Sequence, residues 1–264
     1  MIKSSDILKA VREHKPVVHH LTNWVTIYDC ANIVKVFGAS PVMAHAPEEA
    51  ADMARIASAL VLNIGTLTSD FVESMKIAAR SANTKGIPVI LDVCGAGATP
   101  FRDKKCLELL DTLKIDIIKG NASEIARIAG ENVQTKGVDA GHVTKDLVSL
   151  ARELARKRQS TVVITGPEDI VANEKETFVV KNGVELMTHV VGTGCMAASV
   201  IGTFAAVDKD LVEAAAAGLC CYEVAAELAA ERAGGPAEFK QKLFDAVFNL
   251  APAMVDKKQR IEGR

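Results

Sequence analysis

Residues 59–97, ALVLNIGTLTSDFVESMKIAARSANTKGIPVILDVCGAG, decide the fold. The stretch opens with a short apolar run, and a second apolar run near its end breaks into a glycine-rich loop. Between them, residues 69–85 have the apolar spacing of an amphipathic helix, and Gly86 is typical of a helix end. A helix that joins two buried strands crosses over them right-handed and leaves them parallel. We therefore expect a parallel sheet whose strands all end at one edge.

The same alternation extends in both directions along the chain. Further strands are expected over residues 16–23, 115–121 and 160–166, each next to a helical pattern such as residues 144–159. The helix at residues 4–15 is expected to begin with a serine cap. This order of elements predicts a parallel sheet with helices on both of its faces.

Two regions near the end of the chain depart from this rhythm. Residues 169–187 contain β-branched runs and Asn182-Gly183, which predicts antiparallel strands joined by short turns at the edge of the sheet. The chain otherwise ends in helical patterns. We expect one three-layer α/β/α domain over residues 1–260. Residues 261–264, IEGR, match a protease recognition sequence left from expression or are a native tail, and they are excluded from the expected fold.

Composition excludes several classes of function. The net charge of −2 provides no basic field for nucleic acid, and 4% aromatic residues are too few for base-stacking platforms. The start of the chain is short and amphipathic, unlike a signal peptide, and the long apolar run at residues 211–230 contains acids. No membrane span is therefore expected, and the expected location is the cytoplasm.

The six cysteines form no C-x-x-C pair, so the sequence supports neither a zinc knuckle nor a thioredoxin-like site. Without a secretory signal they are expected to be reduced. Most of them, including Cys220 and Cys221, are expected to fill the core as small apolar groups. His19 and His20 belong to no metal-binding motif and are expected to be structural.

Polar or glycine residues stand where the expected strands end. They are Asn23, Gly65, Asp92, Lys119, Asn121 and Thr165, together with Glu124 in the helix that follows Asn121. In open α/β sheets, ligands bind outside the carboxyl ends of the strands. We therefore expect these residues, which are distant in sequence, to meet in one cleft.

Their chemistry indicates phosphoryl transfer. Asp92 and Glu124 are hard oxygen donors suited to Mg²⁺, directly or through water, and Lys119 offers a positive charge to a phosphate. Each residue also has a plainer interpretation. Asp92 could cap its strand, Glu124 could favour a helix start, Lys119 could be solvated, and Thr165 could belong to a turn.

The stretch HVVGTGCMAASVIG, residues 189–202, contains the expected anion site. Gly192 and Gly194 allow close approach of the backbone to a ligand, and a helix that opens at Cys195 points free N–H groups at it. GTGCMA also matches the loose dinucleotide pattern G-x-G-x-x-A. That pattern should follow the first strand of a βαβ unit, whereas here it follows the antiparallel section, and a Walker A motif is absent.

The sequence resembles the hydroxyethylthiazole kinases of the ribokinase-like superfamily along nearly its whole length. The resemblance lies in the blocks HHLTNWVT, GASPVMAHAPEEA, LVLNIGTL, PVILDVCGAGAT, IIKGNASEI, VVITGPEDIV and VVGTGCMAAS, in that order. It implies transfer of the γ-phosphate of ATP to the hydroxyl of 4-methyl-5-(2-hydroxyethyl)thiazole, in thiamine salvage. It also implies a ribokinase-like fold and a homotrimer with active sites between subunits.

The resemblance assigns roles by position. Residues implied to contact the thiazole are Asn23, Met43, Gly65 and Gly192. Asp92 and Glu124 would serve Mg²⁺ and its waters, and Lys119, Asn121 and Thr165 would contact ATP. Two positions depart from the family pattern. Lys119 stands where the family has arginine, which removes the planar fork of the guanidinium. Val93-Cys94 replaces a proline and a valine, which leaves the loop after Asp92 less constrained.

Related kinases of this superfamily have an aspartate at the position of Cys195, as the general base for the alcohol. We expect Cys195, with Gly192 and Gly194, to form the catalytic turn. A dissociative phosphoryl transfer needs little help from a base, so we expect the thiol mainly to orient the hydroxyl. The alternatives are a kinase for another small alcohol, such as hydroxymethylpyrimidine or a sugar, and a catalytically silent ATP-binding protein.

Overall fold

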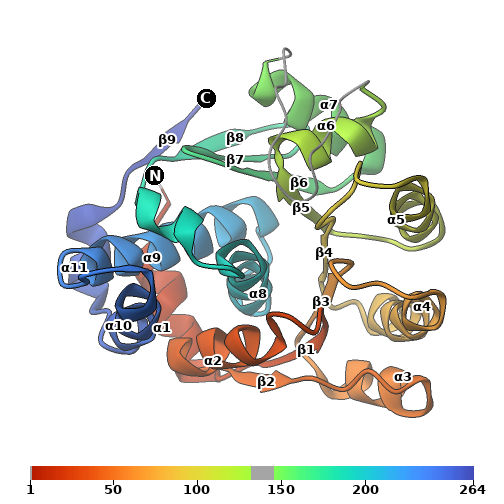
Figure 1. The fold of residues 1–264 in the computed structure, drawn as a ribbon, viewed down its shortest axis with the longest axis horizontal. Coiled ribbons are helices and arrows are strands. Elements are labelled where there is room, and N and C mark those ends of the chain that lie inside the picture. The colour runs from red at the N-terminus through yellow and green to blue at the C-terminus, as the bar shows by residue number, and fades with distance from the viewer. Residues whose placement is uncertain (1, 132–145) are drawn as a thin grey trace.

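The computed structural model describes residues 2–131 and 146–264, which build three layers around one sheet (Figure 1). The strands lie in the order β2-β1-β3-β4-β5-β6-β7-β8-β9. Their bounds are β1 Val17–Leu21, β2 Ser40–Val42, β3 Ala59–Asn63, β4 Val89–Asp92, β5 Ile117–Asn121, β6 Thr161–Thr165, β7 Asp169–Ala172, β8 Thr177–Val180 and β9 Ile261–Gly263. Strands β1 to β6 pair in parallel and β7 to β9 are antiparallel to their neighbours, which confirms the expected fold class.

Helices cover both faces of the sheet (Figure 1). One face carries α3 Pro47–Ile56, α4 Ser69–Lys85, α5 Pro100–Thr112, α6 Ala122–Ala129 and α7 Leu147–Arg158. The other carries α1 Ser4–His14, α2 Ile27–Phe37, α8 Thr193–Ala205, α9 Leu211–Ala230, α10 Pro236–Phe248 and α11 Pro252–Lys258. The helix expected over 144–159 corresponds to α7, and the first two residues of that prediction lie outside the described residues.

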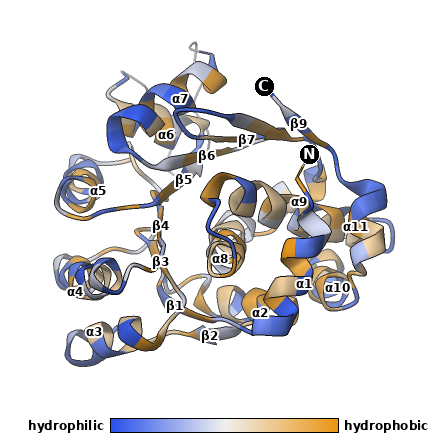
Figure 2. Cartoon of the chain, turned by 180° about the vertical axis from the view of Figure 1, so that it is seen from behind, coloured by the Kyte–Doolittle hydropathy of each residue, from blue (hydrophilic) through white to orange (hydrophobic). Residues whose placement is uncertain are grey.

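The central strands carry mainly hydrophobic residues, whereas outer helices such as α3 and α4 mix hydrophobic and hydrophilic ones (Figure 2). This follows from burial on both sides of a parallel sheet, since β3 and β4 are buried along their whole length.

Helix α8 determines where the site lies. Its residues from Met196 to Ala205 are all buried, because the helix packs between the sheet and α9. A side chain at Gly202 would lie 2.4 Å from Val61 of β3, so this glycine allows the helix to approach the sheet closely. The N-terminus of α8 is thereby held at the edge of the sheet where the parallel strands end.

Two local predictions are corrected by the structure. The first helix has Lys3, not a serine, at its N-cap and makes no side-chain cap hydrogen bond. Asn182-Gly183 follows β8 and leads into a 3-10 helix, η1 Glu185–His189, whereas the turn between β7 and β8 is at residues 173–176. The last residues, for which the sequence left open a native tail or an expression remnant, include Ile261–Gly263, which form β9 and pair with β8.

Candidate active site

The sheet register brings three polar side chains together across neighbouring strands. Asn63 of β3 lies opposite Asp92 of β4, and Asp92 lies opposite Lys119 of β5. All three are at least nine-tenths buried. Because the strands are parallel, their polar ends share one edge, as the sequence predicts.

A chain of amide hydrogen bonds connects Asn23, which follows β1, to Asp92. Asn23 Nδ2 donates to Asn63 Oδ1 at 3.0 Å, and Asn63 Nδ2 donates to Asp92 Oδ2 at 2.8 Å. The orientation of both amides is fixed, because Asn23 Oδ1 accepts from Thr26 and Asn63 Oδ1 accepts from the N–H of Gly65. The two amide nitrogens therefore act only as donors toward whatever lies beside them.

The atom beside them is the sulfur of Cys195, in the first turn of α8. Asn23 Nδ2 lies 3.2 Å and Asn63 Nδ2 3.3 Å from Sγ, and Cys94 also hydrogen-bonds to it. The bond from Cys94 lowers the pKa of Cys195 most, and the charge of Lys119 adds to this effect. The pKa is about 5 although burial works against the shift. Near neutral pH the residue is therefore a thiolate.

Lys119 and two carboxylates form the charged part of the site. Lys119 Nζ lies 3.4 Å from Asp92 Oδ1. Burial works to lower the pKa of Lys119, but the charges of Asp92 and Glu124 raise it above its usual value, so it remains a cation. Burial raises the pKa of Asp92, and the lysine charge opposes this shift.

Glu124 holds two loops together. Its Oε1 accepts from the N–H of Gly95 and its Oε2 from the N–H of Asn121, both at 2.7 Å. Asn121 in turn accepts from the N–H of Glu124, which completes a capping box at the start of α6. Burial raises the pKa of Glu124, while Lys119 and the two N–H groups oppose the shift.

The glycine turn before α8 has little freedom to change. Gly192 has a φ of 98°, and a Cβ there would lie 2.7 Å from Thr26. A Cβ on Gly194 would lie 3.3 Å from Lys119 Nζ, so the lysine reaches the backbone of the turn. The first N–H groups of a helix lack partners within it. A cation, free N–H groups and a thiolate thus converge here, an arrangement suited to an anion next to an alcohol.

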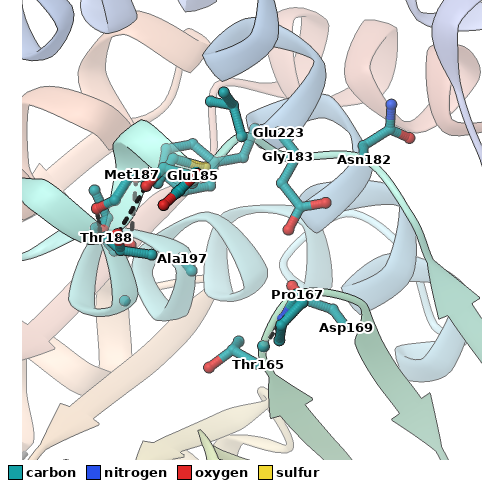
Figure 3. A pocket seen from close by; sticks show the side chains of 15 residues that line it. Thr165, Pro167, Asp169, Asn182, Gly183, Glu185, Met187, Thr188, Ala197 and Glu223 are labelled. Atoms are coloured by element: carbon teal, nitrogen blue, oxygen red, sulfur yellow. Dashed lines mark hydrogen bonds between the residues drawn. The ribbon is translucent and has the colours of Figure 1, made fainter. Parts of the chain in front are cut away.

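A cavity of about 480 Å³ opens beside this turn (Figure 3). Thr165, at the end of β6, and Gly194, in the first turn of α8, line one part of it. Pro167, Val184 and Met187 contribute apolar surface. Its size and mixed lining are typical of small-molecule sites.

The remaining predicted residues lie around the same edge. Met43 follows β2, the edge strand next to β1, and is half-buried. Nearby, Trp24 is 48% exposed, and its ring lies 4.6 Å from that of His45 and 5.6 Å from that of Phe71.

His19 and His20 are buried and hydrogen-bond to backbone carbonyls, in agreement with the structural role expected for them.

Sequence reasoning missed two residues of the site. Asn63 is the central member of the amide chain, yet only Gly65 was expected to matter in that loop. Its signal is a polar residue that ends a strand otherwise made of apolar residues. Cys94 marks a departure in the loop after Asp92, but its contact with Cys195 joins residues about a hundred positions apart, and no local pattern indicates it.

Two kinds of feature are absent from the described residues, 2–131 and 146–264. They contain no cluster of three or more His, Cys, Asp or Glu side chains placed to hold a metal ion. None of their helices is long and apolar enough to cross a membrane.

Comparisons with known proteins show which family the chain belongs to. A protein named hydroxyethylthiazole kinase from Methanosarcina mazei is 56% identical over 255 residues, which cover 97% of this chain and 98% of that protein. The solved structure of hydroxyethylthiazole kinase from Pyrococcus horikoshii OT3 matches with a TM-score of 0.92 at 39% identity, covering 99% of this chain and 98% of that one.

A ribokinase-like superfamily protein from Enterococcus faecalis V583 shares the fold alone, with a TM-score of 0.64 at 15% identity and coverage of 94% and 95%. The family described as the hydroxyethylthiazole kinase family matches residues 8–253. With that match over most of its length and with the relative at 56% identity, the chain belongs to the hydroxyethylthiazole kinase family.

Proposed function

We propose that this kinase transfers the γ-phosphate of ATP to the hydroxyl of 4-methyl-5-(2-hydroxyethyl)thiazole, as a step of thiamine salvage. The observation that carries the proposal is the position of the Cys195 thiolate, which shares the first turn of α8 with the free N–H groups and lies near the charge of Lys119. Adjoining acceptor and donor groups can hold an alcohol and a phosphate in the proximity and orientation that transfer needs. The cytoplasm, where ATP is available, is the proposed location.

The nucleotide would occupy the 480 Å³ cavity, with its phosphates toward the turn. Thr165 and Gly194 line that cavity, and Lys119 Nζ approaches the backbone of Gly194. Asn121 is the last residue of β5 and pairs with Thr165 of β6. Positive charge and aligned N–H groups stabilise the charge that develops on a transferring phosphoryl group, which is the main requirement of this reaction.

Asp92 and Glu124 fit a divalent cation, proposed to be Mg²⁺. Both are hard oxygen donors at the same edge of the sheet, each feels the charge of Lys119, and their carboxylates interact electrostatically. Both Glu124 oxygens already accept backbone hydrogen bonds, so contact through water suits it better than direct ligation. Mg²⁺ commonly keeps several waters and takes its remaining ligands from phosphates, and its charge would neutralise the nucleotide.

Cys195 would orient the substrate hydroxyl. A thiolate with a pKa of about 5 is a good hydrogen-bond acceptor and a weak base, so it can align the hydroxyl with the phosphorus while taking little of its proton before transfer. Asn23 and Asn63 would hold the sulfur in place through their hydrogen bonds to it. Gly65, which lies against Asn23, and Gly192, which lies against Thr26, would form walls around the thiazole together with Met43.

We also propose a homotrimer with active sites between subunits. Val25, Tyr28 and Val191 are 68%, 76% and 74% exposed. Val25 and Val191 lie close to each other because their chain neighbours, Thr26 and Gly192, pack together, and Tyr28 follows two residues after Thr26. Exposed apolar side chains that cluster beside a functional site are typical of an interface. Light scattering should give three times the chain mass, and Tyr28→Glu should lower it.

The direct test mixes the protein with Mg-ATP and a panel of alcohols that includes the thiazole, hydroxymethylpyrimidine and sugars. A mass gain of one phosphate on the thiazole is expected. Gain on another alcohol alone would replace the proposed substrate, and no gain on any alcohol would favour a silent ATP-binding protein.

A further inference from the structure

A second pair of carboxyl groups lines the cavity away from the glycine turn. Asp169 begins β7 and Glu223 lies in the middle of α9; they are 3% and 6% exposed. In Figure 3 the carboxyl group of Glu223 points from α9 toward the turn that carries Pro167 and Asp169. The phosphoryl-transfer chemistry described above uses neither residue.

The two carboxyl groups hydrogen-bond to each other, which requires a proton between them. In the described part of the chain neither forms an ion pair with a lysine, arginine or histidine. Burial raises the pKa of both groups, and the charge of Asp169 raises that of Glu223 further. Two like charges this close cannot both persist in a buried site, so the pair carries at most one negative charge.

The pair is fixed in place but not fully hydrogen-bonded. Asp169 Oδ1 accepts from the N–H of Gly166 at 2.9 Å. Glu223 Oε2 is buried and has no hydrogen-bond partner, although Gly183 lies against the side chain. The shared proton can satisfy only one oxygen of each carboxyl group, and an unpaired buried acceptor costs about 1–3 kcal/mol, so the pair keeps acceptor capacity for a donor from a ligand in the cavity.

We propose that Glu223 accepts a hydrogen bond from the nucleoside part of the nucleotide and thereby helps to select it. This inference rests on the proposed function only in placing a nucleotide in this cavity. The donor is taken to be neutral because the nucleoside part of a nucleotide carries only neutral donors. Adenosine offers two such donors, the exocyclic amino group of the base and the ribose hydroxyls.

The test compares KM values for nucleotide analogues that each lack one donor. Purine riboside triphosphate lacks only the amino group, and 2′-deoxy-ATP and 3′-deoxy-ATP each lack one hydroxyl. With the wild-type enzyme, one of the three should raise KM about tenfold at unchanged kcat, the effect of about one hydrogen bond. The analogue that shows the penalty identifies the donor.

Variants then locate the acceptor. Glu223→Leu should raise KM for ATP by the same factor and abolish the extra penalty of that analogue, because the acceptor is gone. Glu223→Gln keeps an acceptor oxygen and can donate to Asp169, so its KM should stay within about twofold of wild type. Glu213→Gln, on the same helix but away from the cavity, is the matched control.

The proposal is overturned if the wild-type enzyme binds all three analogues as tightly as ATP, or if the penalty persists in Glu223→Leu. Should Glu223→Leu fail to fold, Glu223→Ala, which also removes the acceptor, makes the same comparison. If the enzyme phosphorylates no alcohol, the proposed function fails, and calorimetric titration of the same nucleotides still tests this inference.

Discussion

Replacing Cys195 with alanine separates an orienting thiolate from an essential base. The variant should fold, because each amide donor that loses the sulfur keeps another acceptor: Asn23 Nδ2 bonds to Asn63 at 3.0 Å and Asn63 Nδ2 to Asp92 at 2.8 Å. Thermal unfolding should therefore change little. What disappears is one charge-assisted hydrogen bond from the substrate hydroxyl.

Hydrogen bonds to charged groups contribute about 1.5–3 kcal/mol, so kcat should fall about 10- to 200-fold. Steady-state ADP release in the presence of the thiazole measures this, with the KM for ATP as the internal reference for an intact nucleotide site. Cys195→Ser should lose less, because its hydroxyl can still accept a hydrogen bond. A loss of more than about a thousandfold in kcat at unchanged KM would refute the orienting role and make the thiolate an essential base.

Three further predictions address the groups around the thiolate. The pKa of Cys195 is lowered, so its alkylation by iodoacetamide should be fast above about pH 5 and be lost as pH falls through that value; Cys94→Ala should move the midpoint upward, and peptide mass spectrometry follows both. Gly192→Ala should lower the free energy of unfolding by about 1–3 kcal/mol in urea titration, because its φ is 98° and its Cβ would clash. Gly130→Ala, with a φ of 99° and nothing within 4 Å, should cost less, and equal losses would exclude the clash. Lys119→Met should raise the KM for ATP at least tenfold, whereas Lys119→Arg, which keeps the charge, should leave the KM close to that of wild type. If Lys119→Met and wild type had equal KM values for ATP, the lysine would not belong to the nucleotide site.

The sheet and its polar edge follow from local patterns. Runs such as ALVLN and PVILD are too apolar to be exposed and too short for helices, and helices with clear ends separate them. Parallel connection then places Asp92, Lys119 and Thr165 at one edge without any knowledge of side-chain packing.

Features that depend on packing between residues far apart in the sequence could not be predicted from local patterns. Whether Asn63 points at a sulfur or at solvent is decided by the depth of α8 against β3, which depends on Gly202 far away in sequence. Asn182-Gly183 has the composition of a hairpin turn. The structure uses it differently, because Asn182 hydrogen-bonds to Glu227 of α9 and to the backbone of Lys258 and Arg260 near the end of the chain.

Trp24 is the only tryptophan in the chain, and it lies half exposed against His45 and Phe71, near the end of the site assigned to the acceptor alcohol. Its emission therefore comes from a single known position, and any change in intensity or colour reports on that position alone. Excitation of the native enzyme without a label offers an optical titration of small aromatic ligands and, because Trp24 adjoins Val25, of contact between neighbouring chains.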